Sequence, residues 1–157
     1  VSNTQRTTSD PLDTDPDYGW VNVSCKAEDN FEVINVYLNI TKPDYSFNNI
    51  SMISYGSDNY YSNSSGAFSQ HGNYTYKIWC IDNSFNSNTS DSFIFSLPPN
   101  YDINMDGTPN VLDLVLTSNV FWTSGNGGWR REDVDNSGNV QILDMVYISN
   151  HYAQSWW

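Results

Sequence analysis

Between residue 19 and about residue 97, apolar and polar side chains alternate along the chain with a period of two. Successive side chains of a β-strand point to opposite faces, so this alternation predicts strands with one buried face. Asn, Asp, Ser and Gly residues separate the runs and predict tight turns, which together indicate an antiparallel sandwich. The expected inward positions are Val21, Val23 and Cys25; Ile34, Val36, Leu38 and Ile40; Ile50 and Met52; Tyr74, Tyr76, Ile78 and Cys80; and Phe93, Phe95 and Leu97.

Two proline residues, Pro98 and Pro99, end the alternating region, and two helical patterns follow them. These are LDLVLTSNVF, from Leu112 to Phe121, and LDMVYISNHY, from Leu143 to Tyr152. Each is too short to be stable alone, so the helices must pack together. Their expected apolar faces are Leu114, Leu116 and Val120, and Met145, Val146 and Ile148.

The chain is therefore divided into three parts. Residues 1–18 are polar, acidic and spaced by prolines, and are expected to be a disordered linker. Residues 19–97 form the expected β-sandwich, and residues 98–157 form a second, helical domain.

The chain carries 18 acidic and 6 basic residues among 157, a formal net charge of −12. This charge excludes nucleic acid as a partner and disfavours anionic membranes, because phosphate groups require Lys and Arg. No run of about 18 apolar residues is present, so no membrane span is expected. Its 6 Trp and 11 Tyr residues, together with few charges, favour an extracellular β-rich protein, and the start without Met suggests a processed protein or a fragment.

The chain has two cysteines, Cys25 and Cys80, and both stand at expected inward positions. This arrangement fits a disulfide between the two sheets of an immunoglobulin-like fold, or else two free buried thiols. Six Asn-x-Ser/Thr sequons all precede residue 98 and are candidate glycosylation sites: Asn22, Asn39, Asn49, Asn63, Asn73 and Asn88. Cysteines, sequons and the loops described next together predict a secreted or cell-surface protein.

Two segments, DINMDGTPNVLD (102–113) and DVDNSGNVQILD (133–144), align with each other without a gap. In each, oxygen-bearing side chains recur at alternate positions, a glycine stands sixth and an aspartate closes the twelfth position. Calcium takes six to eight oxygen ligands, and a short loop supplies them in this order. The expected ligands are Asp102, Asn104, Asp106, the Thr108 carbonyl and Asp113 in the first loop, and Asp133, Asp135, Ser137, the Asn139 carbonyl and Asp144 in the second.

Calcium is favoured over other metals by the chemistry of these positions. Magnesium prefers tighter octahedral geometry, and zinc would be accompanied by Cys or His residues, which are absent from both loops. One such segment alone can be a plain turn, but two aligned copies, each followed by an apolar helix, predict two calcium ions bound at 102–113 and 133–144.

The closing strands of the first region have a generic family resemblance. The run GNYTYKIWCIDNSFNSNTSDSFIF resembles the end of immunoglobulin-like, PKD-like and fibronectin-like repeats of microbial surface proteins, through Gly72, Tyr74, Tyr76, Asp82 and Asn86. The resemblance covers the region of the expected sandwich and implies fold class only.

At the duplicated loops the chain resembles a dockerin, a module that attaches its host protein to a cohesin domain of a scaffold, as in cellulosomes. The resemblance covers about residues 100–157 and rests on loop spacing, duplication and a closing Asp rather than Glu. It implies an immunoglobulin-like sandwich followed by a small all-α, EF-hand-like domain. It also assigns partner recognition to the two residues before each closing Asp and to a pair in each following helix: Val111, Leu112, Ser118 and Asn119, then Ile142, Leu143, Ser149 and Asn150.

The near identity of these two sets implies that either half could bind the partner after a half-turn rotation. The alternative is that the four aliphatic residues belong to the local core. Two departures from the family pattern are present: Pro109 lacks the N–H that would bridge the loops, and Ser-Asn replaces the Lys-Arg pair common in bacterial members. Aromatic residues near the two ends of this region, Tyr101 on one side and Trp156 and Trp157 on the other, are expected to clasp the termini, or else the two tryptophans lie in a tail or in contact with the sandwich.

No catalytic constellation is evident, since His71 and His151 are isolated, so we expect no enzyme activity in this part of the protein, although it could be the tail of a secreted enzyme. Carbohydrate binding is the alternative function, because Tyr55, Tyr60, Tyr61 and Trp79 could stack against sugars while the calcium loops are purely structural. The favoured interpretation makes the sandwich a spacer or a stabilising neighbour of the calcium-binding region.

Overall fold

The computed structural model describes residues 1–63 and 65–156, with the side chains of Asn63 and Ser65 outside the description. The chain forms two compact units. The first comprises residues 1–8, 20–68 and 73–96, and the second comprises residues 9–19, 69–72 and 97–157.

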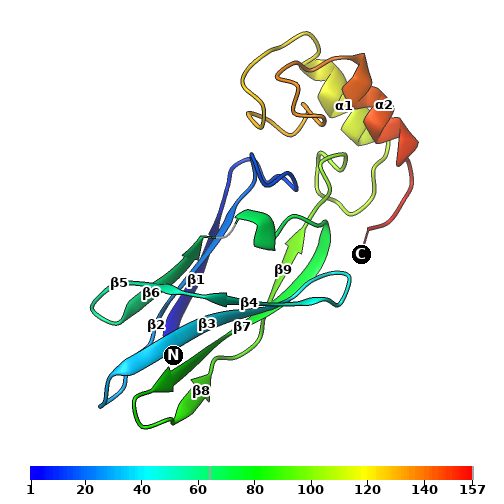
Figure 1. Cartoon of the computed structure of the whole chain (residues 1–157). Helices are drawn as coiled ribbons and strands as arrows, with labels where there is room; N and C mark the ends of the chain where they lie inside the picture. The colour runs from blue at the N-terminus through cyan, green and yellow to red at the C-terminus, as the bar shows by residue number, and fades with distance from the viewer. Residues whose placement is uncertain (64, 157) are drawn as a thin grey trace. The chain divides into compact units, whose positions relative to one another are not determined.

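The first unit consists of two β-sheets, which Figure 1 shows as arrows. One sheet has the strand order β1-β2-β6-β5, formed by Ser2–Thr8, Val21–Lys26, Asn59–Asn63 and Ile53–Gly56. The other has the order β4-β3-β7-β8, formed by Phe47–Ser51, Val33–Thr41, Gly72–Asp82 and Ser87–Thr89, and β9 (Phe93–Leu97) also pairs with β7. A 3₁₀ turn at Ser65–Ala67 lies between β6 and β7.

The alternation of the sequence correctly predicts most of the buried positions in these strands. Buried side chains come from both sheets: Val21 and Val23 from β2, Val36, Leu38 and Ile40 from β3, Tyr74, Tyr76 and Ile78 from β7, and Phe95 and Leu97 from β9. Phe68 joins them, with its ring centroid 5.0 Å from that of Tyr74 and 5.9 Å from that of Phe95. Ile34 is an exception, since it lies exposed near the start of β3.

The N-terminal residues differ from the expected disordered linker. Residues Ser2–Thr8 form β1, which pairs antiparallel with β2. Its side chains are mostly exposed and polar, so main-chain hydrogen bonds hold the strand and apolar alternation is absent. The Arg6 guanidinium lies 4.3 Å from the ring centroid of Phe95, a cation–π contact that also anchors this edge strand.

The expected disulfide is absent, because Cys25 and Cys80 are free thiols. Regular alternation in β7 ends at Ile78, and Cys80 is only half-buried with its two neighbours. Cys80 pairs in regular register with Val36 of β3, and the register shifts only beyond it, between Val33 and Asn35. Burial raises the pKa of the Cys25 thiol to about 11, and the nearby Cys80 contributes in the same direction.

The fold class expected from the sequence is wrong. The chain is mostly β, with 37% of its residues in strands and 13% in helices, and the described residues contain no duplicated loop–helix all-α domain. The second unit has two nine-residue helices, α1 (Val111–Asn119) and α2 (Ile142–Asn150), which lie side by side (Figure 1). The remainder is turns, because Asp and Asn side chains accept backbone N–H groups locally and so compete with helix formation.

The core of the second unit is small. Ile103, Val134 and Ile148 form a buried apolar cluster, with Tyr101 and Leu114 packed against it, and Leu97 and Val140 of the same unit are also buried. The expected helix faces are partly wrong, since Leu116 and Val146 are exposed and Thr117 is buried instead. Within the described residues, neither helix has the length and apolar character needed to cross a membrane.

We predict that Ile78→Ala, which truncates a fully buried side chain of β7, lowers the free energy of unfolding of the first unit by about 2–5 kcal/mol. The matched control is Ile94→Ala in β9, because that side chain is 71% exposed and its loss should change stability by less than about 0.5 kcal/mol. Urea denaturation followed by tyrosine and tryptophan fluorescence measures both values. Equal effects of the two substitutions would contradict the assigned core.

Candidate metal centre

Each predicted loop folds back onto its own closing aspartate. Oδ1 of Asp113 accepts hydrogen bonds from the backbone N–H groups of Ile103 (2.7 Å) and Asn104 (3.1 Å). Its Oδ2 accepts one from the N–H of Asn110 (2.7 Å). The closing carboxylate therefore holds both ends of the first loop and caps the N-terminus of α1.

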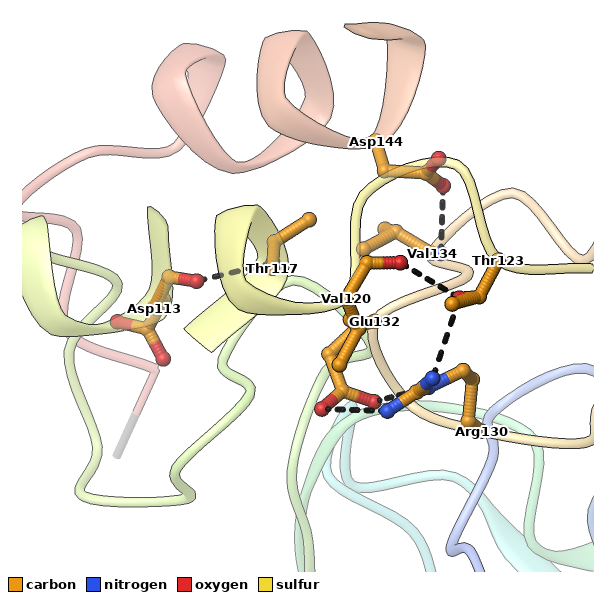
Figure 2. A network of polar contacts seen from close by, with 8 residues as sticks. All are labelled: Asp113, Thr117, Val120, Thr123, Arg130, Glu132, Val134 and Asp144. Carbon is orange, nitrogen blue, oxygen red and sulfur yellow. Dashed lines mark hydrogen bonds and ion pairs between the residues drawn. The ribbon is translucent and has the colours of Figure 1, made fainter. Parts of the chain in front are cut away.

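The second loop repeats this geometry. Asp144 accepts from the N–H groups of Val134 (2.7 Å, drawn in Figure 2), Asp135 (3.3 Å) and Gln141 (2.8 Å). Its carboxylate therefore closes the second loop and caps α2 as Asp113 does for the first.

The first aspartate of each loop stabilises the turn at the glycine in the sixth position. Oδ2 of Asp102 accepts from the N–H of Gly107 (2.9 Å), and Oδ2 of Asp133 accepts from the N–H of Gly138 (2.8 Å). Both glycines have positive φ, +98° and +83°, a region that L side chains rarely adopt. The two loops thus share the same turn and the same closure.

The carboxylates of the loops are unusually buried. Asp102, Asp113 and Asp144 are 0% exposed, and Asp133 is 1% exposed. In the second loop, carboxylate oxygens of Asp133, Asp135 and Asp144 all lie within 4.8 Å of one another and could hold a metal ion. Buried carboxylates without a cation are costly, because desolvation and mutual repulsion both oppose ionisation.

The pKa values of the second loop reflect this cost. Burial raises the pKa of Asp133 and of Asp144, and the charge of Asp135 raises both further. Ionisation of Asp133 and Asp144 therefore costs more free energy in this loop than it does in water. A bound divalent cation reverses this effect, because it stabilises the charged form of each ligand.

In the first loop, one carboxylate oxygen lacks a partner. Oδ1 of Asp102 is buried, and no donor of the described residues reaches it. The rest of this residue is fully bonded: Oδ2 also accepts from the indole Nε1–H of Trp156 (2.6 Å), and the carbonyl accepts from Arg131 (2.7 Å). A buried, unpaired carboxylate oxygen in a loop of oxygen-bearing side chains fits a cation.

The remaining predicted ligands lie in the same two loops. Asn104 and Asp106 are joined by a hydrogen bond from Asn104 Nδ2 to Asp106 Oδ2 (2.8 Å), which lowers the pKa of Asp106. The Thr108 carbonyl accepts from Asn110 Nδ2 (2.8 Å). In the second loop, the Ser137 hydroxyl lies 3.4 Å from Asp133 Oδ1 and 3.3 Å from the Asn139 carbonyl. Each loop therefore contributes three carboxylates and additional neutral oxygens.

The two halves are joined at the eighth position of each loop, where Pro109 and Val140 stand. Val140 exchanges two hydrogen bonds with the segment that follows α1: Trp122 N–H to Val140 O (2.9 Å) and Val140 N–H to Thr123 O (2.9 Å). Pro109 receives only one, from the N–H of Ala153 after α2 (2.8 Å). Pro109 can only accept a hydrogen bond here, because proline has no N–H to donate. Both contacts join a loop to the segment that follows the other helix, and neither joins the two loops directly.

Polar contacts also fix the segment after α1 (Figure 2). The Thr123 hydroxyl donates to the carbonyl of Val120 and accepts from Arg130 (3.2 Å). Arg130 is itself paired with Glu132 (2.9 Å). These contacts hold in place the Thr123 carbonyl, which accepts the hydrogen bond from the N–H of Val140.

The residues assigned to partner recognition lie on the surface. Val111, Leu112, Ile142 and Leu143 are between 51% and 60% exposed, so they are not part of the local core. Ser118, Asn119, Ser149 and Asn150 are at least partly exposed. The exposed aliphatic side chains of α1 and α2, which we call the aliphatic face, are Val111, Leu112, Val115, Leu116, Ile142, Leu143 and Val146. Leu116 and Val146 were expected in the core, and Val115 was not assigned a role from the sequence.

The sequons of the first unit differ in accessibility. Three of them are exposed: Asn49, Asn73 and Asn88. Asn22 and Asn39 are half-buried, and their amide oxygens are buried without a hydrogen-bond partner among the described residues. The side chain of Asn63 lies outside the described residues. The aromatic residues considered for sugar binding do not form one open platform, since Tyr60 and Tyr61 are half-buried and Trp79 packs against Tyr37 at 5.7 Å between ring centroids.

No protein-family model matches this chain, and no curated protein sequence matches it.

We predict that the protein binds two calcium ions, and that Asp106→Ala or Asp135→Ala weakens binding in its own loop by at least about 10-fold while the other loop stays functional. Each substitution removes one carboxylate without removing the closing Asp and the hydrogen bonds that it accepts. Isothermal titration with calcium chloride measures the stoichiometry and affinity. Asp91→Ala, which removes an exposed carboxylate from the first unit, is the charge-matched control. Loss of one calcium ion in this variant would contradict the assignment of the two sites to the loops.

Proposed function

We propose that this chain is a non-catalytic, calcium-dependent attachment module that docks its host protein onto a cohesin-like domain of a scaffold or surface protein. The observation that supports this proposal most strongly is the pair of loops lined by buried carboxylates. Each loop leads directly into a helix whose first turn exposes aliphatic side chains. Metal binding and partner binding are coupled in this proposal because the same residues end the loops and begin the helices.

Calcium is the proposed ion in both loops. The ligand set consists of carboxylate, amide, hydroxyl and carbonyl oxygens, which hard cations prefer, and neither loop contains Cys or His. The unpaired Oδ1 of Asp102 supports a cation in the first loop. The clustered carboxylates of Asp133, Asp135 and Asp144 support a cation in the second.

Bound calcium would have a structural role. The apolar core of this unit contains Ile103, Val134 and Ile148, which is little to offset the entropy of ordering its long turns. Without cations, three carboxylates in each loop repel one another. The two ions are therefore proposed to order α1 and α2 and to fix the first turns that face the partner.

The aliphatic face is the proposed docking surface. Exposed clusters of aliphatic side chains on a soluble protein indicate an interaction site. The two halves present nearly the same chemistry, because Val111 and Leu112 in one half correspond to Ile142 and Leu143 in the other. Either half is therefore proposed to engage the partner, in two orientations related by a half-turn.

The sandwich is proposed to act as a spacer or stabilising neighbour, and the host is proposed to be extracellular or attached to the cell surface. The sequons at Asn49, Asn73 and Asn88 are compatible with glycosylation in that environment. The free Cys25 and Cys80 add no support, because the thiols are not joined.

We predict that Leu112→Asp combined with Leu143→Asp abolishes binding to a cohesin, because a charge is then buried in either binding mode. Each single substitution should weaken binding only slightly, since the other half remains available. Calorimetry against a panel of cohesins measures the affinities, and calcium binding by the double variant shows that the loops remain intact. Ile94→Asp, which places a charge on an exposed aliphatic residue of the first unit, is the control and should leave binding unchanged.

A different outcome would exclude one part of the proposal. If one single substitution alone abolishes binding, the two halves are not interchangeable. If no cohesin binds the wild-type protein in calcium, the attachment function itself is wrong.

A further inference from the structure

The segment that precedes the sandwich in the sequence, residues 9–19, belongs to the metal-binding unit. We infer that Asp13 of this segment is a positioning residue for both calcium loops, and that residues 98–157 alone form an incomplete metal unit. This inference rests on the proposed calcium binding. It goes beyond it by assigning a role to a segment that the whole sandwich separates from the loops in the sequence.

Asp13 contacts both halves of the metal unit with one carboxylate. Its Oδ1 accepts from Asn100 Nδ2 (2.6 Å), and Asn100 stands just before the first loop, which begins at Asp102. Its Oδ2 accepts from Asn136 Nδ2 (3.0 Å), and Asn136 is the fourth residue of the second loop. The Asp13 side chain is only 7% exposed, so these charge-assisted hydrogen bonds are shielded from water.

Both asparagines are themselves held in a single orientation. Asn100 Oδ1 accepts from the backbone N–H and the hydroxyl of Thr14 (3.1 and 3.3 Å). Asn136 Oδ1 accepts from the N–H of Gly128 (3.0 Å). Each amide is therefore clamped through its oxygen, and its NH₂ group is fixed toward Asp13.

Arg131 adds a second connection between the segment and the first loop. Its guanidinium donates to the carbonyls of Leu12, Pro99 and Asp102, each at 2.7 Å. The residue is 8% exposed and stands just before the second loop, which begins at Asp133. One buried cation thus joins the N-terminal segment, the start of the first loop and the approach to the second.

The segment also fits sterically, which argues against an incidental contact. A Cβ at Gly127 would lie 2.6 Å from Oη of Tyr18, and one at Gly128 would lie 2.5 Å from Cβ of Tyr18. Gly128 also has a φ of +71°. Glycine at these two positions allows Tyr18 of the segment to approach the turn before the second loop closely.

Loop geometry controls calcium affinity, because groups that orient ligands typically change metal affinity by about 10–100-fold when they are removed. Loss of Asp13 should therefore weaken both loops, whereas loss of Asn100 or Asn136 should affect mainly the loop beside it. A residue that only supported folding in general would not show this selectivity.

The test uses the full chain titrated with calcium chloride and followed by ¹⁵N NMR. The amide signals of Gly107 and Gly138 report the two loops separately, because each N–H donates to the first aspartate of its own loop. We expect Asp13→Ala to weaken calcium binding about 10-fold at both loops. Asp17→Ala, an exposed acidic residue of the same segment, is the control and should leave both affinities unchanged.

Two further variants keep the inference testable if Asp13→Ala does not fold. Asn100→Ala should weaken the first loop and Asn136→Ala the second, each with the other loop near its wild-type affinity. Wild-type affinity in all the variants that fold would overturn the positioning role of Asp13 while leaving the calcium proposal intact. Absence of calcium binding in the wild-type protein would overturn both.

Discussion

The second unit depends on the electrostatics of buried carboxylates. Asp102, Asp113, Asp133 and Asp144 are almost completely removed from water in a unit whose apolar core is very small. Backbone N–H groups satisfy part of their hydrogen-bonding capacity and order the loops. They do not neutralise the charge: Oδ1 of Asp102 accepts no hydrogen bond from the described residues, and burial raises the pKa of Asp133 and of Asp144. The divalent cation proposed for each loop would balance this charge.

The closure that the two loops share explains the surface of the unit. Because the closing aspartate of each loop also caps a helix, the residues just before it must stand at the first turn and face outward. Hydrogen bonds at Val140 and Pro109 join each loop to the segment after the opposite helix, so the two halves form one body. The position of the aliphatic face thus follows from loop closure. Binding or loss of a metal ion in a loop would therefore shift the first turn of the helix that carries this face.

The sequence predicted features that depend on local spacing and missed those that depend on long-range contacts. Oxygen-bearing residues at alternate positions around Gly107 and Gly138 predicted loops that turn and close alike, and period-two alternation predicted the buried residues of β2, β3 and β7. The all-α second domain was wrong, because only two nine-residue helices form among the described residues of that unit. The strand β1 and the contacts of Asp13 could not be found from apolar patterns. Main-chain hydrogen bonds hold β1, and polar side chains form the contacts of Asp13. Cys80 was misplaced because the regular alternation of buried and exposed side chains in β7 ends at Ile78.

The most direct test of the account is a crystal structure of the protein grown with calcium, with anomalous diffraction data collected to locate the ions. Two peaks are expected, one in each loop, with oxygens of Asp102, Asp106 and Asp113 or of Asp133, Asp135 and Asp144 at about 2.3–2.6 Å from the ion. Absence of a peak in both loops at saturating calcium would contradict the central claim that cations balance these buried carboxylates.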